Sequence, residues 1–442
     1  MIRSIFVDGF KTLTDFKIEI NPGLNILVGP NGAGKTNIIS FFEFLGHLQD
    51  MNISNAISSV GGASSVFRKI GSDAFQANIR SSVVGINKIS SRRYLYYQFD
   101  FNIAVYESES IIYDYQRLML KYRSVDSISN YRIKPFDLDI EKRIDENFKS
   151  TTKIYDLNDK KFRSYPLSRR EESKEQTQLR IKHILNEYLG PDDSLLKGMR
   201  SIFREIRYLF SDIYGGKIFN IVPSKVKIPE DSAQKPGIRK DGAGLYSTLY
   251  AMKKNETNHP RRAIGFHYYD DFVDIGNSTI PDVLHYVQLA NDAIENIEVL
   301  NNPFDNQLQV RITISGKDGS SVLPLSSMSD GTIKWISLIT ILLTNRSIFS
   351  IEEPENYLHP LMQTEIVSVM RSLMRTESFI LMSTHSETIL NSAKPNELIV
   401  ISFSEGRTIA NRPQNAKELS VEIQRTGFGL GYYYIAGSLD NE

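Results

Sequence analysis

Residues 29–36 read GPNGAGKT, and this stretch decides the fold that we predict for the chain. It follows residues 24–28, LNILV, a continuous apolar run that is typical of a strand buried on both faces. Residues 37–48 come next and are apolar on nearly every side, which predicts a buried helix. The pattern G-x-x-x-x-G-K-[ST] between a strand and a helix predicts a phosphate-binding loop.

The residue types of this loop suit phosphate chemistry. Its glycines allow the backbone to curl so that successive N–H groups converge on a β-phosphate, and the helix N-terminus adds a partial positive charge. Lys35 is expected to reach the β- and γ-phosphates, and Thr36 to offer its hydroxyl to Mg²⁺. A chance glycine turn before a helix is the alternative, and the order of strand, loop and helix argues against it. The predicted nucleotide-binding residues are Gly29, Asn31, Gly32, Ala33, Gly34, Lys35 and Thr36.

Composition sets broad limits on the function. The 442 residues are enough for two or three domains. Lys plus Arg and Asp plus Glu both number 52, so the net charge of +0 gives no bulk electrostatic argument for nucleic acid. Cys is absent, which excludes disulfides, thiolate zinc sites and cysteine nucleophiles and fits a reducing cytosol. No apolar run approaches the roughly 18 residues of a membrane span, so we expect a cytoplasmic protein without a membrane partner.

Alternating apolar residues predict an antiparallel sheet in the first third of the chain. Residues 2–7 and 16–20 are expected to form a hairpin that leads into the strand before the loop. Residues 94–103 and 111–120 are expected to form two neighbouring strands. In the first of these, every second side chain is apolar: Leu95, Tyr97, Phe99, Phe101 and Ile103.

Charged stretches with apolar residues three and four apart predict helices at residues 139–148, 172–189 and 193–210. We therefore divide the chain into an N-terminal lobe (1–136), a helical insertion (137–222) and a C-terminal lobe (223–442). Basic residues of the insertion interleave with acidic ones, which favours a solvated helix face over a nucleic-acid groove. These basic residues are Lys160, Lys161, Arg163, Arg169, Arg170, Lys174, Arg180, Lys182, Arg200, Arg204 and Arg207.

The C-terminal lobe carries a second group of chemical residues. A helix is predicted at residues 281–300 and a strand at 308–314. Residues 347–351, SIFSI, read as a short apolar strand, and Glu352 and Glu353 follow it, as in a Walker B site. Glu352 is expected to hold Mg²⁺ through a water, and Glu353 to polarise the attacking water. A solvated acidic pair at a strand end is the alternative interpretation.

Two further motifs flank the acidic pair. Residues 378–383 predict a strand, and His385 after it is expected to sense the γ-phosphate, although a lone His in this place is more often structural. Before the pair, SMSDGT at residues 327–332 precedes an apolar helix predicted at 333–343. A Ser-Asp-Gly turn at a helix N-terminus is a second anion site or, alternatively, an ordinary helix cap.

The ordered set GPNGAGKT, SMSDGT, IEEPENYLHP and STHS resembles the ATP-binding-cassette head of the SMC, RecF and OLD group of ATPases. The resemblance covers about residues 1–48 and 241–401. It implies an α/β P-loop NTPase of the ABC-ATPase head type, with an antiparallel β subdomain and a helical insertion. It also implies that ATP is sandwiched between two heads, with Ser329 and Gly331 of one subunit reaching the γ-phosphate held by the other.

The forms EEPE-x-x-LHP and THS, the stretch at 241–249 and a Gly/Tyr-rich tail are similar to AAA-family ATPases of bacterial anti-phage systems. These include the ATPase subunits of the PARIS and Septu systems and OLD-like proteins. The sequence departs from the family at Glu352, where Asp is usual, and at His359, where transporters have Asp. The Q-loop glutamine is either Gln98 or Gln116. Neither the Toprim nuclease domain of full OLD proteins nor an SMC coiled-coil arm is expected.

The resemblance implies an ATPase that uses ATP and Mg²⁺, forms a homodimer or higher homo-oligomer through ATP, and acts as a sensor or scaffold in anti-phage defence. Its effector is expected to be a separate polypeptide, such as a nuclease or Toprim-like protein. The competing hypothesis is a RecF-like DNA-repair or DNA-binding ATPase, with DNA as a partner. A third is a nucleotide-binding structural protein with negligible turnover, against which Lys35, Thr36 and Glu353 argue.

Overall fold

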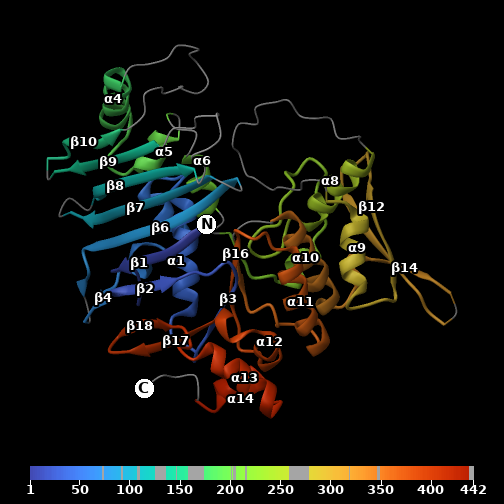
Figure 1. Cartoon of the computed structure of the whole chain (residues 1–442). Coiled ribbons are helices and arrows are strands. Elements are labelled where there is room, and N and C mark those ends of the chain that lie inside the picture. Colours follow the sequence, from blue (N-terminus) through green and yellow to red (C-terminus); the bar gives the residue numbers. More distant parts are fainter. Residues whose placement is uncertain are drawn as a thin grey trace. The chain divides into compact units, whose positions relative to one another are not determined.

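The computed structural model contains two compact units, each assembled from several segments of the chain (Figure 1). Unit 1 comprises residues 1–22, 29–217 and 399–412, and unit 2 comprises residues 23–28, 218–398 and 413–442. The structure describes residues 1–437, except 72–73, 91–92, 107–109, 125–135, 146, 158–173, 201, 203–205, 215–216, 258–277, 318 and 346–348. Of the basic residues that were expected on a solvated helix face, those at positions 160–170 and Arg204 therefore lie outside the described residues.

A seven-stranded antiparallel sheet in the order β10-β9-β8-β7-β6-β1-β2 is the framework of unit 1. Its strands are β1 (Ile2–Asp8), β2 (Phe16–Glu19), β6 (Asn78–Ser90), β7 (Arg93–Val105), β8 (Ile111–Ser124), β9 (Phe136–Ile144) and β10 (Ser150–Leu157). The predicted hairpin at the N-terminus and the predicted pairing of β7 with β8 are both confirmed. The apolar face predicted for β7 is also confirmed, since its five side chains are at most 2% exposed.

The helix predicted at residues 139–148 is wrong, because this segment forms strand β9. Leu138, Ile140, Lys142 and Ile144 alternate along β9 and are all buried. A charged Lys142 therefore occupies an inward position, which breaks the apolar alternation that would have identified a strand. The two later helical predictions match helices: α4 (Lys174–His183), the π-helix η1 (Ile184–Tyr188), α5 (Leu195–Met199) and α6 (Ile206–Tyr214).

Unit 1 also contains helix α1 (Lys35–His47), which begins at the end of the predicted phosphate-binding loop. Phe10 packs edge-on against Phe41 of α1 with ring centroids 5.1 Å apart, and it also contacts Phe44. The smaller elements are α2 (Ile53–Ser59), α3 (Ala63–Val66), β4 (Lys69–Ile70), β5 (Ala74–Phe75), β17 (Leu398–Ser404) and β18 (Arg407–Asn411). Of these, β17 and β18 form an antiparallel hairpin.

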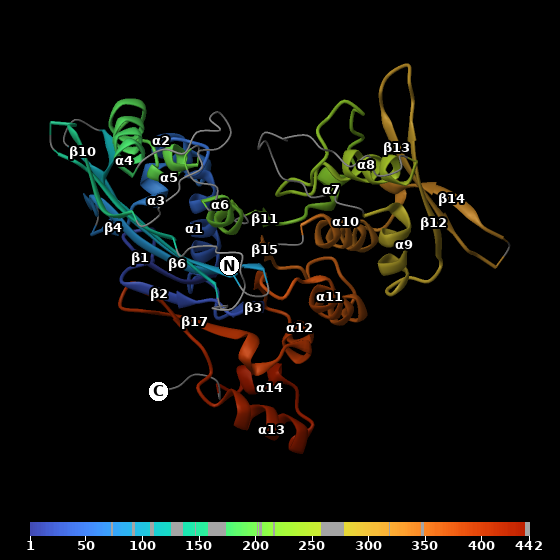
Figure 2. The same cartoon turned by 45° about the horizontal axis from the view of Figure 1, so that its top comes forward.

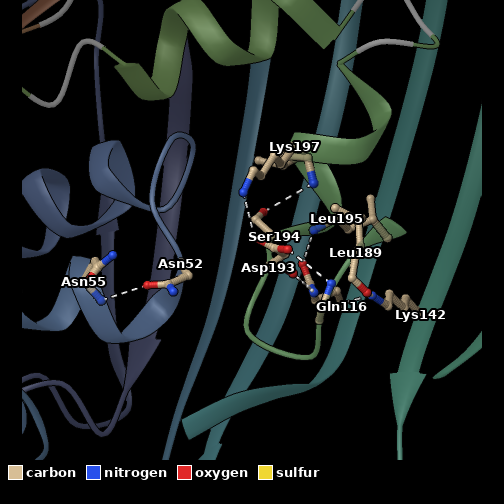
Figure 3. Close-up of polar contacts among 11 residues, drawn as sticks. Asn52, Asn55, Gln116, Lys142, Leu189, Asp193, Ser194, Leu195 and Lys197 are labelled. Carbon is tan, nitrogen blue, oxygen red and sulfur yellow. Dashed lines mark hydrogen bonds and ion pairs between the residues drawn. The ribbon is translucent and has the colours of Figure 1, made fainter. Parts of the chain in front are cut away.

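Buried polar groups attach the loop before α5 to the large sheet (Figure 3). Lys142 Nζ donates to the carbonyl of Leu189 at 3.2 Å. Gln116 uses both ends of its amide, because Nε2 donates to the Asp193 carbonyl and Oε1 accepts from the Leu195 N–H. Burial lowers the pKa of Lys142 to about 8, and nearby carboxylates oppose this shift. The segment is thus held by hydrogen bonds that are shielded from water, where each unpaired group would be costly.

Unit 2 contains parallel strands in the order β11-β15-β16-β3. These strands are β3 (Gly23–Val28), β11 (Ile218–Phe219), β15 (Phe349–Glu352) and β16 (Phe379–Ser383). The helix predicted at residues 333–343 is α10 (Asp330–Thr344). It lies beside α11 (Pro360–Leu373) in both views (Figure 2). Every residue of α10 from Thr332 to Thr344 is buried.

A separate three-stranded antiparallel sheet belongs to unit 2 and contains β12 (Ile294–Asn301), β13 (Leu308–Ile314) and β14 (Ser321–Pro324). The strand predicted at 308–314 is confirmed as β13. The single helix predicted at 281–300 is wrong in its second half, because α9 (Ile280–Gln288) ends and β12 follows. The other elements of unit 2 are α7 (Pro223–Val226), α8 (Leu245–Thr257), η2 (Leu325–Ser327), α12 (Glu387–Ser392), η3 (Pro395–Glu397), α13 (Ala416–Thr426) and α14 (Leu430–Ile435).

None of the helices in the described part of the chain is long and apolar enough to cross a membrane.

The first prediction concerns Lys142 and pH. Its pKa is about 8 in the folded chain and about 10.4 in an unfolded one, so between these values the unfolded state binds more protons and folding stability rises with pH. We expect the difference in melting temperature between wild type and Lys142→Met to move in favour of wild type from pH 7.5 to about 9.5. Lys121→Met, at an exposed position of β8, should show no such trend. A difference that stays constant over this range would contradict the lowered pKa.

Candidate active site

The predicted phosphate-binding loop lies in unit 1 and forms a turn that ends at the N-cap of α1. Gly32 and Gly34 have φ angles of 81° and 105°, in the region that favours glycine. Asn31, Gly32 and Thr36 are exposed, whereas Ala33, Gly34 and Lys35 are buried. The first N–H groups of a helix have no intrahelical partner, so this end of α1 can bind an anion.

Two glycines of the loop allow close approach to the β17–β18 hairpin. A Cβ at Gly29 would lie 2.1 Å from the Ile401 carbonyl oxygen, and a Cβ at Gly34 would lie 2.1 Å from Thr408 Oγ1. Thr408 is in turn fixed by Thr12, since their hydroxyls are 2.6 Å apart and the Thr408 N–H donates to the Thr12 carbonyl. The loop is therefore supported by the Ile401 backbone at Gly29 and by the Thr408 side chain at Gly34, and any larger residue at either position would displace it.

Lys35 is 7% exposed and its ammonium lies over the loop. Nζ donates to the carbonyls of Gly29 at 2.8 Å and Pro30 at 3.1 Å. The charge is thus held at the curl of the backbone where the sequence predicts phosphate. Thr36, in the first turn of α1, keeps an exposed hydroxyl that suits a hard cation such as Mg²⁺.

Glu352, Glu353 and His385, the residue expected to sense the γ-phosphate, lie in unit 2 at the carboxyl ends of the parallel strands. Leu27 of β3 is in register with Ser383 of β16, and Ser383 with Glu352 of β15. The next residue along each strand continues the ladder, because the Thr384 N–H donates to Leu27 and the Glu353 N–H to Ser383. The carboxyl ends of the three strands therefore coincide, and β3 continues directly into Gly29 and the loop.

Glu353 begins a strained turn, residues 353–357, which we call the acidic turn. Glu353 has φ 43° and Tyr357 has φ 67°, conformations that cost a non-glycine residue roughly 1–3 kcal/mol. Asn356 Nδ2 donates to Glu353 Oε2 at 2.9 Å and fixes the side chain of the predicted base. Glu352 accepts from Asn220 Nδ2 at 3.5 Å, which holds the predicted metal ligand beside β11.

His385 is exposed, and its backbone N–H donates to Glu355 Oε1 at 2.7 Å. The same oxygen accepts from the Thr384 hydroxyl at 2.8 Å, while Glu355 Oε2 is buried without a hydrogen-bond partner in the described part of the chain. Glu355 and Asn356 are functional candidates that the sequence analysis missed. Both stand inside the quoted EEPEN segment, so the signal was present but had no chemical role assigned to it.

Residues 329–332 form the signature turn at the start of α10, also in unit 2. Ser329 is the N-cap and its hydroxyl accepts from the Thr332 N–H at 3.2 Å. Asp330 forms an ion pair with Lys227 at 2.7 Å. A Cβ at Gly331 would lie 2.6 Å from the Tyr357 carbonyl oxygen, so this glycine permits the signature turn to pack on the acidic turn.

The donors in each unit fit a magnesium nucleotide. Unit 1 provides a glycine cradle that side chains would fill, a lysine and a hydroxyl, and unit 2 provides the carboxylates of Glu352 and Glu353. Within the described residues no group of three or more His, Asp or Glu residues could hold a metal by itself. A cation bound by the carboxylates of Glu352 and Glu353 in unit 2 would therefore take further oxygens from phosphate and water, as Mg²⁺ does with nucleotides. The Q-loop assignment stays open, because the amides of Gln98 and Gln116 are both occupied by partners in unit 1.

Comparison with known proteins gives a family match over most of the chain. Residues 24–391 match the family described as "AAA domain, putative AbiEii toxin, Type IV TA system". The matched range includes the loop, the signature turn, the acidic turn and His385.

Individual relatives match over shorter stretches. The chain is 37% identical over 46 residues to the DNA replication and repair protein RecF of Aliivibrio fischeri, which is 10% of this chain and 13% of RecF. It is 40% identical over 48 residues to the Septu protein PtuA of Bacillus thuringiensis, 11% of each chain. The crystal structure of an SmcHead bound to the C-winged helix domain of ScpA aligns over 93% of this chain and 97% of that one, with 12% identity and a TM-score of 0.47. The matches thus span a small part of the curated relatives.

The second prediction tests the glycine cradle. Gly34→Ala should weaken nucleotide binding strongly, because its Cβ meets Thr408 and because alanine at this φ costs about 1–2 kcal/mol. Gly32→Ala is the matched control, since it has a positive φ but nothing within 4 Å of its Cβ. Titration with a fluorescent ATP analogue should show a larger loss of affinity for Gly34→Ala than for Gly32→Ala. Equal losses would contradict the packing argument.

Proposed function

The chain belongs to the family described as "AAA domain, putative AbiEii toxin, Type IV TA system", and on that premise we propose that it hydrolyses ATP as the sensor or scaffold subunit of an anti-phage defence system. The predicted fold class and family are confirmed at the level of an α/β ABC-type ATPase related to SMC and RecF. Within this fold, the observation that carries the proposal is the coincidence of the three strand ends. The loop, the acidic turn and the switch residues follow β3, β15 and β16 in register.

Each residue has a proposed role in hydrolysis. Lys35 and the loop N–H groups bind the β- and γ-phosphates, assisted by Gly29, Asn31, Gly32, Ala33 and Gly34. Thr36 and Glu352 would each offer an oxygen to Mg²⁺, which would neutralise charge on the phosphates when bound. Glu353 accepts a proton from the attacking water, and Asn356 orients its carboxylate at 2.9 Å. His385 contacts the γ-phosphate, and Glu355 holds its backbone.

The signature turn is proposed to act on the nucleotide of a second copy of the chain. Ser329 and Gly331 would bring the N-terminus of α10 to that γ-phosphate, so that ATP becomes part of the interface between two heads. The Lys227–Asp330 ion pair supports this role, because it neutralises a carboxylate that would otherwise repel phosphate. A separately encoded effector, such as a nuclease or Toprim-like protein, would respond to the closed pair.

A RecF-like role in DNA repair is the second candidate, and the RecF match supports it as the PtuA match supports defence. The two candidates share the phosphate chemistry, so neighbouring genes distinguish them. A gene for a small nuclease or Toprim-like protein would favour defence, and replication or recombination genes would favour repair.

The third prediction tests the base and the phosphate lysine. Lys35→Ala should abolish nucleotide binding, whereas Glu353→Gln should retain ATP while hydrolysis falls roughly a hundredfold or more, because the amide cannot accept the proton. Glu365→Gln, on the following helix α11, is the control and should hydrolyse like wild type. Phosphate release and filter binding with MgATP provide the measurements. Equal hydrolysis by wild type and Glu353→Gln would remove Glu353 as the base.

The fourth prediction tests the shared site. Ser329→Arg should spare ATP binding but abolish hydrolysis and ATP-dependent association, and mixing it with Lys35→Ala should recover turnover. Recovery is expected because one site of each mixed pair combines wild-type Lys35 with wild-type Ser329. Turnover of each variant alone and of the mixture is measured after subunit exchange. Absence of recovery, with both variants folded and exchanging, would mean that the site is not shared.

A further inference from the structure

Lys334 is a buried ionisable side chain in the part of α10, residues 332–344, whose other residues carry no charge. It is 1% exposed and lies in the continuously buried part of α10, one turn after Gly331. Burial lowers its pKa to about 8, while the charges of Glu355 and Glu353 oppose the shift. An apolar side chain of similar length would avoid this desolvation cost, so packing alone gives no reason for a lysine here.

The partners of Lys334 are both ends of the acidic turn. Nζ donates to the carbonyl oxygen of Glu353 at 3.0 Å and lies 5.7 Å from the centroid of the Tyr357 ring. Glu353 and Tyr357 are also the two residues of the acidic turn that have positive φ. Glu353 is held further by its N–H bond to Ser383 and by the Asn356 N–H, which donates to the same carbonyl at 3.2 Å. The Glu353 carbonyl therefore accepts two hydrogen bonds, one from Lys334 Nζ and one from the Asn356 N–H, and both help to hold the strained conformation of Glu353.

The preceding turn of α10 contacts the same segment. Gly331 approaches the Tyr357 carbonyl so closely that a Cβ would lie 2.6 Å from it. Gly331 and Lys334 are three residues apart and so share one face of the helix. The signature turn and the acidic turn are consequently joined by two contacts, one between backbones and one through an ammonium group.

We propose that Lys334 is a positioning residue for hydrolysis, which couples the position of the signature turn to the orientation of Glu353 in the same chain. When α10 shifts on contact with the phosphate of a second head, Lys334 carries the Glu353 carbonyl with it and sets the direction of the carboxylate. The inference rests on the proposed function, because it assigns a role to the turn that carries the proposed base. The inference adds that α10 regulates the orientation of Glu353.

Replacing Lys334 by Met in the full chain tests the coupling. We expect kcat for ATP hydrolysis to fall roughly ten- to hundredfold, the size expected when a catalytic group is misplaced, while the affinity for MgATP stays close to wild type. Lys334→Arg should regain most of kcat, since a guanidinium can donate to the same carbonyl. Thr340→Val is the control, because this buried hydroxyl on α10 donates only within the helix, to Ile336 at 2.8 Å. It should leave kcat and affinity unchanged.

Wild-type kcat in Lys334→Met would overturn the inference, and so would a parallel loss of affinity and kcat, which indicates a general structural role. Either result leaves the proposed function intact if Glu353→Gln is inactive. Conversely, wild-type hydrolysis by Glu353→Gln would overturn the proposed function rather than the coupling alone. If the Met variant does not fold, Lys334→Leu, which also lacks a donor but has a shorter side chain, takes its place with the same outcomes.

Discussion

Parallel pairing of β3, β16 and β15 in a fixed register is the constraint on which the position of the acidic turn depends. The register sets Leu27, Ser383 and Glu352 in one row, so the residues that follow them must leave the sheet together. All five residues of β16 are buried, and each large apolar side chain contributes roughly 1.5–3 kcal/mol. The strain of about 1–3 kcal/mol at Glu353 is small beside this sum. The sheet can therefore hold the acidic turn in a conformation that the turn alone would not adopt.

Close backbone approach is the second shared feature, and it occurs separately in each unit. In unit 1, Gly29 and Gly34 let the loop lie against Ile401 and Thr408. In unit 2, Gly331 lets α10 lie against Tyr357. Phosphate-binding backbone must stay rigid, because its N–H groups have to be in place before the ligand arrives. Packing a loop directly on another backbone gives that rigidity without placing a side chain over the anion.

Sequence patterns predicted β7 and β13, in which apolar and polar side chains alternate, and failed where non-local partners changed the pattern. The inward Lys142 made β9 look helical, and its partner carbonyl belongs to Leu189, 47 residues away. In β12 the pairing register shifts between Ile294 and Asn296. Because of this shift, Ile294 and Ile297 are both buried although they are three residues apart in the sequence, a spacing typical of a helix. A bulge that depends on pairing with β13 cannot be recognised from β12 alone. The domain limits of the insertion stay a proposal.

The chemical residues were easier to predict than the residues that hold them. Lys35, Thr36, Glu352 and Glu353, the residues proposed for the chemistry, stand in motifs whose spacing suits a phosphate site, so the sequence alone suggests them. Lys334 stands in an apolar helix with no motif of its own, and only the fold brings it to Glu353.

Seen from the acidic turn, the contacts form a hub. Lys334 of α10 binds the turn at Glu353, and Glu355 of the turn binds Thr384 and the His385 backbone after β16. The signature helix α10 thus contacts both ends of the acidic turn, at Glu353 and Tyr357, and the residues after β16 contact its middle residue, Glu355. A displacement of either one must pass through a backbone already held at two positive φ angles, where few alternative conformations are accessible. Under the proposed function, such a turn would transmit a movement of α10 to the residues after β16 instead of absorbing it.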